Sequence, residues 1–201
     1  MLYKKNMYEI ELKAHLENKN QTIQTLKTFA NYEGFFHKQD NYFKKQLENS
    51  EDYISVRIRK EQSKTSNGEL NKIFLTYKQK ELKTTKDGCS IEVNNEKECE
   101  LSESSTIISI LLDTNFSEYL KKEKIVEKFT YSTKYGIATI EICTIPPIGD
   151  FIELEILSNE NNNSNIENIK NELYLILEKC NVPLSNIENR YYSQLLKEFK
   201  K

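Results

Sequence analysis

Hydrophobic and polar residues alternate along much of the chain, which is typical of β-strands that have one face toward a core. In residues 8–14, Glu9, Glu11 and Lys13 fall on one face, and the other face carries tyrosine, isoleucine, leucine and alanine. The same kind of pattern predicts eight strands, over residues 8–14, 41–47, 53–60, 73–79, 89–101, 126–132, 137–143 and 151–157. Asn67-Gly68 and Tyr135-Gly136 are turn signals that link neighbouring strands as hairpins.

Apolar residues at helical spacing predict helices outside these strands. They cover about residues 20–32, a segment with Ser102 as its N-cap, residues 164–180 with a capping box at Ser164 and Glu167, and a short last segment around Leu195. A sheet built from so many hairpins can close into a barrel, and closure is favoured because a closed sheet has no exposed edges. We therefore predict an α+β fold, a closed barrel of about eight antiparallel strands with helices packed outside.

Composition and net charge exclude several classes of protein. The 201 residues fit one domain over residues 1–201, and 29 Lys+Arg against 31 Asp+Glu give a net charge of −2. This balance gives no reason to expect a nucleic-acid or membrane-surface partner. No apolar run approaches the roughly 18 residues of a transmembrane helix, and the first residues lack the apolar stretch of a signal peptide.

Cysteine, histidine and aromatic residues suggest no site by themselves. The four cysteines lie far apart without a C-x-x-C pair, so we expect reduced thiols in a cytoplasmic protein rather than a zinc site or disulfides. His15 and His37 have no partner in the pattern and are expected at ordinary surface positions. The tyrosines and phenylalanines follow the apolar faces and are interpreted as core residues, not as base-stacking platforms. Lys121-Lys122 is interpreted as solvated charge.

Charged residues form rows on single strand faces. The rows are Glu9, Glu11 and Lys13; Arg57 and Arg59; Thr76, Lys78 and Lys80; Glu96, Glu98 and Glu100; and Glu153 and Glu155. One interpretation is that each polar face looks at water, the usual arrangement in an antiparallel sheet. The other is that the rows point into a solvated tunnel, where carboxylates would bind a hard divalent cation and the basic residues would bind phosphate oxygens. Periodicity does not decide between the two.

Several segments, in order, resemble the CYTH family of triphosphate tunnel metalloenzymes. They are Glu9-Ile10-Glu11-Leu12-Lys13, Gln39-Asp40-Asn41-Tyr42-Phe43, Val56-Arg57-Ile58-Arg59, Leu75-Thr76-Tyr77-Lys78, Glu96-x-Glu98 and Gly149-Asp150-Phe151-Ile152-Glu153-Leu154-Glu155. The segment from Arg190 to Leu196 is similar to the end of the class IV adenylate cyclase branch of that family. The resemblance covers roughly residues 7–197 and implies a tunnel of eight antiparallel strands.

The resemblance also implies roles for particular residues. Glu9, Glu11, Glu153 and Glu155 would bind a divalent metal, Mg²⁺ or Mn²⁺. Lys13, Arg57 and Arg59 would bind the triphosphate and serve as the catalytic cations, with Lys78 and Lys128 as further substrate-binding residues. Members of this family often dimerise, so a homodimer is an additional expectation.

Three positions depart from the family pattern. Asn94 and Thr130 stand where arginines are usual, and Cys143 stands where an aspartate is usual, with Glu141 on the same face. Our first hypothesis is a class IV adenylate cyclase-like enzyme that converts ATP to cyclic AMP and pyrophosphate. The second is a hydrolase that releases orthophosphate from inorganic triphosphate or thiamine triphosphate. The third is a polyphosphate- or nucleotide-binding module without catalysis, which the three departures motivate.

Overall fold

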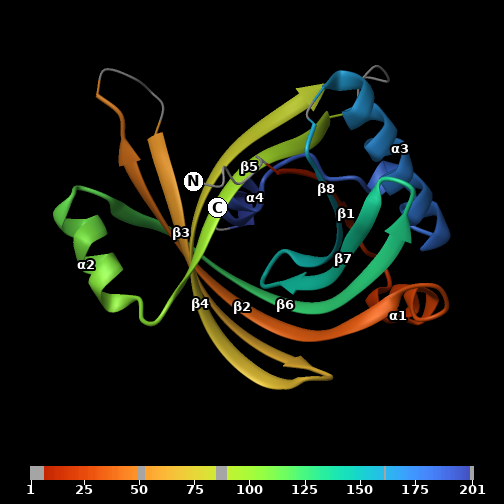
Figure 1. The fold of residues 1–201 in the computed structure, drawn as a ribbon, viewed down its shortest axis with the longest axis horizontal. Coiled ribbons are helices and arrows are strands. Elements are labelled where there is room, and N and C mark those ends of the chain that lie inside the picture. The colour runs from red at the N-terminus through yellow and green to blue at the C-terminus, as the bar shows by residue number, and fades with distance from the viewer. Residues whose placement is uncertain (1–6, 49–52, 85–89, 161, 200–201) are drawn as a thin grey trace.

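Eight antiparallel strands close into a barrel in the computed structural model, which describes residues 7–48, 53–84, 90–160 and 162–199. The strands are β1 (Tyr8–His15), β2 (Asn31–Gln46), β3 (Tyr53–Thr65), β4 (Gly68–Thr84), β5 (Ser90–Leu101), β6 (Ser117–Thr133), β7 (Gly136–Ile145) and β8 (Gly149–Ser158). Around the barrel they follow the order β1-β5-β4-β3-β2-β6-β7-β8, with β8 pairing back to β1 (Figure 1). The predicted fold class is confirmed.

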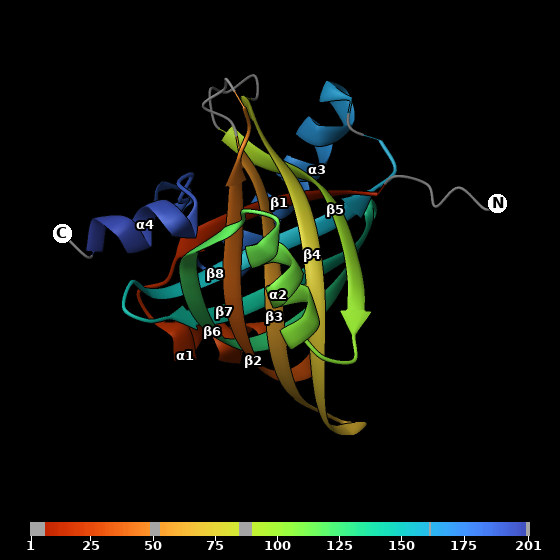
Figure 2. The same ribbon diagram turned by 90° about the vertical axis from the view of Figure 1, so that its left-hand side faces the viewer.

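Helices lie on the outside and at one end of this barrel. They are α1 (Lys19–Leu26), α2 (Ser105–Asp113), α3 (Asn163–Lys179) and α4 (Tyr192–Phe199), with a 3₁₀ turn at Leu184–Asn186. Figure 2 shows α2 in front of β3 and β4, and α4 at one end of the barrel. No helix within the described ranges is both long and apolar enough to cross a membrane.

The main apolar core lies between the barrel wall and α3, not inside the barrel. Ile10 and Leu12 of β1 are buried there together with Ile152, Leu154 and Ile156 of β8, against Ile169, Leu173 and Leu177 of α3. Because side chains alternate along a strand, the residues between them must face the barrel interior. This placement decides between the two interpretations of the charged rows, since Ile10 and Leu12 do not fill the barrel.

Two strands begin much earlier than the sequence pattern predicts. β2 starts at Asn31 instead of residue 41, and α1 ends at Leu26 instead of residue 32. A register shift between Tyr32 and Gly34 interrupts the alternation there. Gly34 has φ +136°, and a Cβ at this position would lie 2.5 Å from the Lys64 carbonyl oxygen, so only glycine fits.

β6 starts at Ser117 instead of residue 126 for a different reason. Apart from Leu120, its first half is mainly charged or polar on both faces, because the inward face lines the tunnel and the outward face meets water. A strand of this kind has no hydrophobic alternation to detect. The predicted helix starts are also displaced, because Asn162, not Ser164, caps α3 by accepting a hydrogen bond from the Asn165 amide, at 2.9 Å. Ser104, not Ser102, is the N-cap residue of α2.

Candidate active site

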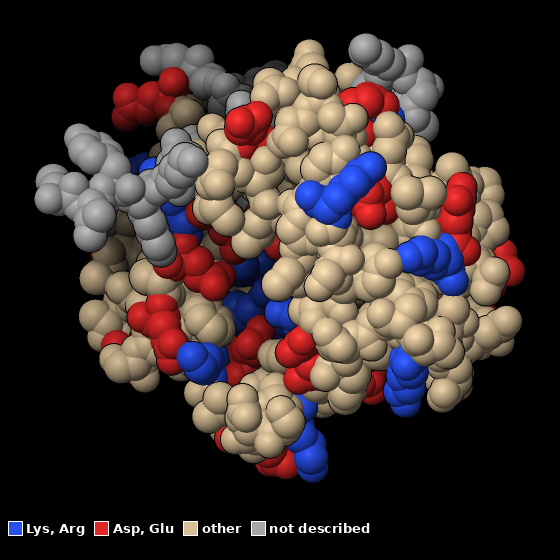
Figure 3. All heavy atoms as spheres, turned by 45° about the vertical axis from the view of Figure 1, so that its right-hand side comes forward, with Lys and Arg blue, Asp and Glu red and all other residues tan. Residues whose placement is uncertain are grey.

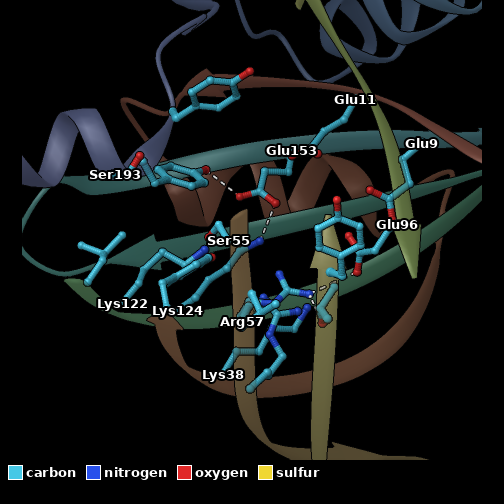
Figure 4. A pocket seen from close by; sticks show the side chains of 18 of the residues that line it. Glu9, Glu11, Lys38, Ser55, Arg57, Glu96, Lys122, Lys124, Glu153 and Ser193 are labelled. Atoms are coloured by element: carbon cyan, nitrogen blue, oxygen red, sulfur yellow. Dashed lines mark hydrogen bonds and ion pairs between the residues drawn. The ribbon is translucent and has the colours of Figure 1, made fainter. Parts of the chain in front are cut away.

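The barrel encloses a cavity of about 650 Å³ that is lined by charged and aromatic side chains. Its volume is within the roughly 300–1,000 Å³ that small-molecule sites occupy. Figure 3 shows the hollow in the surface, with basic side chains in its depth and acidic side chains around it. In Figure 4, Glu9, Glu11 and Glu96 lie on one side of the cavity, and Lys38, Arg57, Lys122 and Lys124 lie on the other. The charged rows therefore face a tunnel.

Asp40 of β2 organises the basic side. Arg59 donates to both of its carboxylate oxygens, at 2.7 Å from Nε and 3.0 Å from Nη2, and Lys122 Nζ lies 3.2 Å from Oδ2. Burial raises the pKa of Asp40, but Arg59 and Lys122 outweigh that effect and hold it well below the usual 3.8. Asp40 is 1% exposed, so it acts as a fixed internal counter-ion that holds two cations in place.

A chain of alternating charges crosses the cavity beside this cluster. Glu141 of β7 accepts hydrogen bonds from Lys38, at 2.6 Å, and from Lys124, at 2.7 Å. Lys124 also donates to Glu153 of β8, whose other oxygen accepts a hydrogen bond from the Tyr192 hydroxyl, at 2.6 Å. Burial raises the pKa of Glu153, yet the nearby Lys124 ammonium is the main reason that it falls to about 2. Glu153 is thus an anion shared between a lysine and a tyrosine.

Arg57 of β3 connects the basic and acidic sides. Its Nη2 donates to Thr76 Oγ1, at 3.0 Å, and to the carboxylates of Glu96 and Glu98, at 3.2 and 3.4 Å. Its Nε is buried and has no hydrogen-bond partner among the described residues. A buried guanidinium N–H without an acceptor is costly, so this donor is available for a ligand oxygen that reaches the cavity.

Carboxylates dominate the opposite side, around β1. Glu11 lies directly across from Glu155 in the β1–β8 register, and both line the cavity with Glu9. Asn94 of β5 donates from Nδ2 to Glu11, at 3.3 Å, while its buried Oδ1 has no partner in the described part of the chain. These oxygens are the donor type that Mg²⁺ and Mn²⁺ prefer. The donor set of Glu9, Glu11 and Glu155 therefore fits a divalent cation in its chemistry.

The geometry of these carboxylates is less complete than a metal site requires. Within the described ranges, no three His, Cys, Asp or Glu side chains lie together in a way that could hold one ion. Glu153 is the predicted metal ligand that stands apart, because Lys124 and Tyr192 already contact both of its oxygens.

The predicted site residues are only partly brought together. Glu9, Glu11, Arg57, Arg59, Glu153 and Glu155 all line the cavity. Lys13 does not line it: its side chain is 4% exposed, and its ammonium pairs with Glu92, at 2.8 Å, close to the Tyr191 and Tyr192 rings. Lys128 also lies away from the cavity lining, with its Nζ 5.6 Å from the centroid of the Phe36 ring. The side chain of Lys78 is outside the described residues.

The sequence pattern does not identify several residues that line the cavity. They are Lys38, Tyr42, Lys122, Lys124, Glu141 and Tyr192. The interpretation of Lys122 as solvated charge is wrong, since its side chain is 8% exposed and paired with Asp40. Lys122 and Lys124 stand two residues apart on one strand face, and that spacing was the available signal. Thr130 lies outside the cavity lining and hydrogen-bonds Glu33, at 2.6 Å, so the missing arginine at that position does not leave a gap in the site.

The chain matches the model of the CYTH domain over residues 7–192. It belongs to the CYTH family. CYTH proteins are generally enzymes, with a metal-dependent tunnel that binds triphosphate substrates. The described tunnel agrees with that fold.

Solved structures share the architecture at low sequence identity. The PH1819 protein of Pyrococcus horikoshii is 24% identical, with 94% of this chain and 98% of that chain covered and a TM-score of 0.69. A candidate adenylate cyclase of Vibrio parahaemolyticus is 13% identical, with coverage of 94% and 98% and a TM-score of 0.65. A candidate adenylyl cyclase of Hippeastrum, reported to have a dominant triphosphatase activity, is 15% identical, with coverage of 96% and 95% and a TM-score of 0.59. No curated protein matches.

Proposed function

We propose that this CYTH protein is a class IV adenylate cyclase-like enzyme that converts ATP to cyclic AMP and pyrophosphate. The observation that carries the proposal is a single cavity with carboxylates around β1 and a fixed cluster of Arg57, Arg59, Lys122 and Lys124 facing them. A triphosphate carries enough negative charge to satisfy such a cluster, and arginine can bind its oxygens in a bidentate manner.

In the reaction, the ribose 3′-oxygen forms a bond to the α-phosphorus and gives up its proton to water, while the bond from that phosphorus to the bridging oxygen breaks and this oxygen leaves with pyrophosphate. Arg57 has a buried N–H without an acceptor in the described structure, and we assign it to the phosphate chain. Arg59, fixed by Asp40, would stabilise the negative charge that develops on the leaving pyrophosphate. Because Asp40 holds it in place beforehand, little reorganisation is needed when the charge develops.

Glu9, Glu11 and Glu155 are the residues that we assign to Mg²⁺ or Mn²⁺. When bound, the ion supplies Lewis acidity to the phosphate oxygens and to the attacking hydroxyl group. The predicted ligand Glu153 joins this set only when Lys124 releases it, because its oxygens are already used. The substrate-binding roles of Lys13, Lys78 and Lys128 remain part of the proposal, but Lys13 and Lys128 would act from outside the cavity lining.

A second candidate is hydrolysis of the terminal phosphate with water as the nucleophile. The triphosphatase activity reported for the Hippeastrum neighbour favours it, and the same cations would serve. Inorganic triphosphate and thiamine triphosphate are its candidate substrates.

Product analysis separates these candidates. Purified protein is incubated with ATP, inorganic triphosphate or thiamine triphosphate, with Mg²⁺ and Mn²⁺ in parallel, and cyclic AMP and orthophosphate are measured. We expect cyclic AMP from ATP, with a Glu11→Gln variant as the inactive control. Orthophosphate from triphosphate without cyclic AMP from ATP would support the hydrolase instead. Tight nucleotide binding without any product would support a non-catalytic binding module.

A further inference from the structure

One end of the cavity is apolar and aromatic rather than charged. It is lined by Leu47 directly after β2, Tyr53 and Ile54 at the start of β3, and Tyr119 near the start of β6. The strand register brings them together, because Gln46 pairs with Tyr53 and Tyr42 pairs with Leu120. Tyr53 is 52% exposed and Leu47 is 40% exposed, so this rim presents apolar surface to any ligand that enters.

Three tyrosine rings lead from this rim to the basic cluster. The Tyr53 and Tyr119 ring centroids are 6.3 Å apart, and those of Tyr119 and Tyr42 are 6.2 Å apart. Tyr119 is held in place by a 3.2 Å hydrogen bond between its hydroxyl and Ser55 Oγ. Tyr42 donates to Asp40, at 3.3 Å, and the Lys122 ammonium lies 5.6 Å from its ring. The interpretation of the aromatics as core residues is therefore wrong for these tyrosines.

The arrangement fits a molecule with a flat, apolar group at one end and a polyanion at the other. We propose that Tyr53 and Tyr119 form a stacking subsite for the base of a nucleoside triphosphate, whose phosphates extend to Arg57, Arg59 and Lys122. Base–tyrosine stacking tolerates any base, because every base has a π-face. The inference rests on the proposed function, since both place a triphosphate in this cavity, and it names the substrate class as nucleotide rather than inorganic triphosphate.

Lys44, which lies beside the rim but does not line the cavity, favours a neutral ring over a cationic one. The Lys44 ammonium lies 5.7 Å from the Tyr53 ring centroid and 5.5 Å from that of Tyr119. A thiazolium ring, as in thiamine triphosphate, would bring a second positive charge to the same tyrosine faces. Like charges repel, so the rim selects against it. A neutral nucleobase meets no such repulsion.

The test compares two triphosphate ligands, of which only one carries a nucleoside. Calorimetry measures the dissociation constants of the α,β-methylene analogue of ATP and of inorganic triphosphate, both without divalent metal so that neither is turned over. In Tyr53→Ala and Tyr119→Ala we expect the analogue to bind about tenfold more weakly, the loss of one base–aromatic stack. We expect inorganic triphosphate to bind these variants as it binds the wild type. Tyr53→Phe and Tyr119→Phe should retain the affinity, because the ring stays.

Tyr32→Ala is the matched control, since Tyr32 is equally exposed but does not line the cavity. The subsite is refuted if both ligands weaken together, if neither changes, or if thiamine triphosphate binds more tightly than the ATP analogue. Failure of the proposed function looks different. In that case the tyrosine variants lose nucleotide affinity as expected, but the wild type makes no cyclic AMP.

Discussion

The two faces of β1 and β8 lie in opposite environments within the same strands. Outward, Leu12 and Leu154 pack beneath α3 in an apolar core. Inward, Glu11 and Glu155 face each other across the strand pair and line the charged cavity. The outer face is apolar, and its burial stabilises the fold. The inner face brings carboxylates close together, which favours ligand binding at a cost in stability. Neighbouring residues can therefore be mutated to separate the two properties.

The largest expected contrast is between Glu11→Gln and Leu12→Ala. Glu11→Gln should abolish metal-dependent turnover, because the amide keeps the shape and removes the charge that a hard cation requires. Its free energy of unfolding should stay the same or rise slightly, because repulsion among the carboxylates falls. Leu12→Ala should lose about 2–5 kcal/mol of stability by leaving a cavity under α3 while the folded fraction keeps its activity.

Activity assays and urea unfolding of both variants check this contrast. Glu123→Gln on the outward face of β6 serves as a charge control, since Glu123 lies outside the cavity lining. An active Glu11→Gln variant would contradict the functional assignment of the inner face.

Asp40→Asn tests whether the inner face also contributes to stability. The change leaves Arg59 and Lys122 buried without their shared counter-ion, and breaking such a buried pair costs about 3–5 kcal/mol. Glu69→Gln is the matched control, because the Lys64–Glu69 pair is more than 70% exposed and should be worth about 0–1 kcal/mol. Urea unfolding measures the free energy of unfolding of both variants. Equal losses in the two variants would show that the inner ion pairs act like surface pairs.

Lys124→Met tests whether the Lys124 ammonium competes with a divalent metal ion for the carboxylates of the cavity. Removing its ammonium frees one carboxylate oxygen of Glu153, while Tyr192 keeps the other, and removes a positive charge from the neighbourhood of the carboxylates. We expect Mn²⁺ to bind at least about tenfold more tightly, because a like charge a few ångströms away costs on the order of a few kcal/mol. Electron paramagnetic resonance of Mn²⁺ measures the affinity, with Lys121→Met as the control, since Lys121 lies on the same strand but is exposed and does not line the cavity. Unchanged or weaker Mn²⁺ binding would mean that Lys124 does not compete with the ion.

The same contrast explains what the sequence predicts and what it does not. Strands with one apolar face, such as β1 and β8, are predicted nearly to their ends, because their outer residues pack under α3. The first half of β6 is mainly polar on both faces and is missed, together with Lys122 and Lys124. Glu9 and Glu11 stand in a short motif, whereas Lys38, Glu141 and Tyr192 come from three elements far apart in the sequence. Only the closed barrel brings these three together, so no local pattern could predict their contacts.

Low pH should lower the free energy of unfolding, because the Asp40 carboxylate becomes protonated. Its folded pKa lies well below 3.8 because Arg59 and Lys122 favour the anion, whereas its unfolded pKa is near that value. The stabilisation is thus fully present above about pH 4 and is lost as the pH falls toward the folded pKa. Urea unfolding at pH 6, 4 and 3 should show falling stability, with a shallower slope in Asp40→Asn. Identical slopes in the two proteins would exclude Asp40 as a source of the acid sensitivity.

Tyr192→Phe should have a smaller effect than the changes at Glu11, Asp40 and Lys124, since it removes one hydroxyl group and keeps the ring. The ring still packs edge-on against Phe151, with centroids 5.1 Å apart, and the Lys122 ammonium still lies 5.2 Å from its centroid. The lost interaction is the 2.6 Å hydrogen bond to Glu153, which keeps its contact with Lys124. We expect a loss of about 1–2 kcal/mol in the free energy of unfolding, because hydrogen bonds to charged groups exceed those between neutral groups. Tyr119→Phe, which loses a hydrogen bond to neutral Ser55, should lose less, and the reverse order would show that Glu153 gains little from the tyrosine.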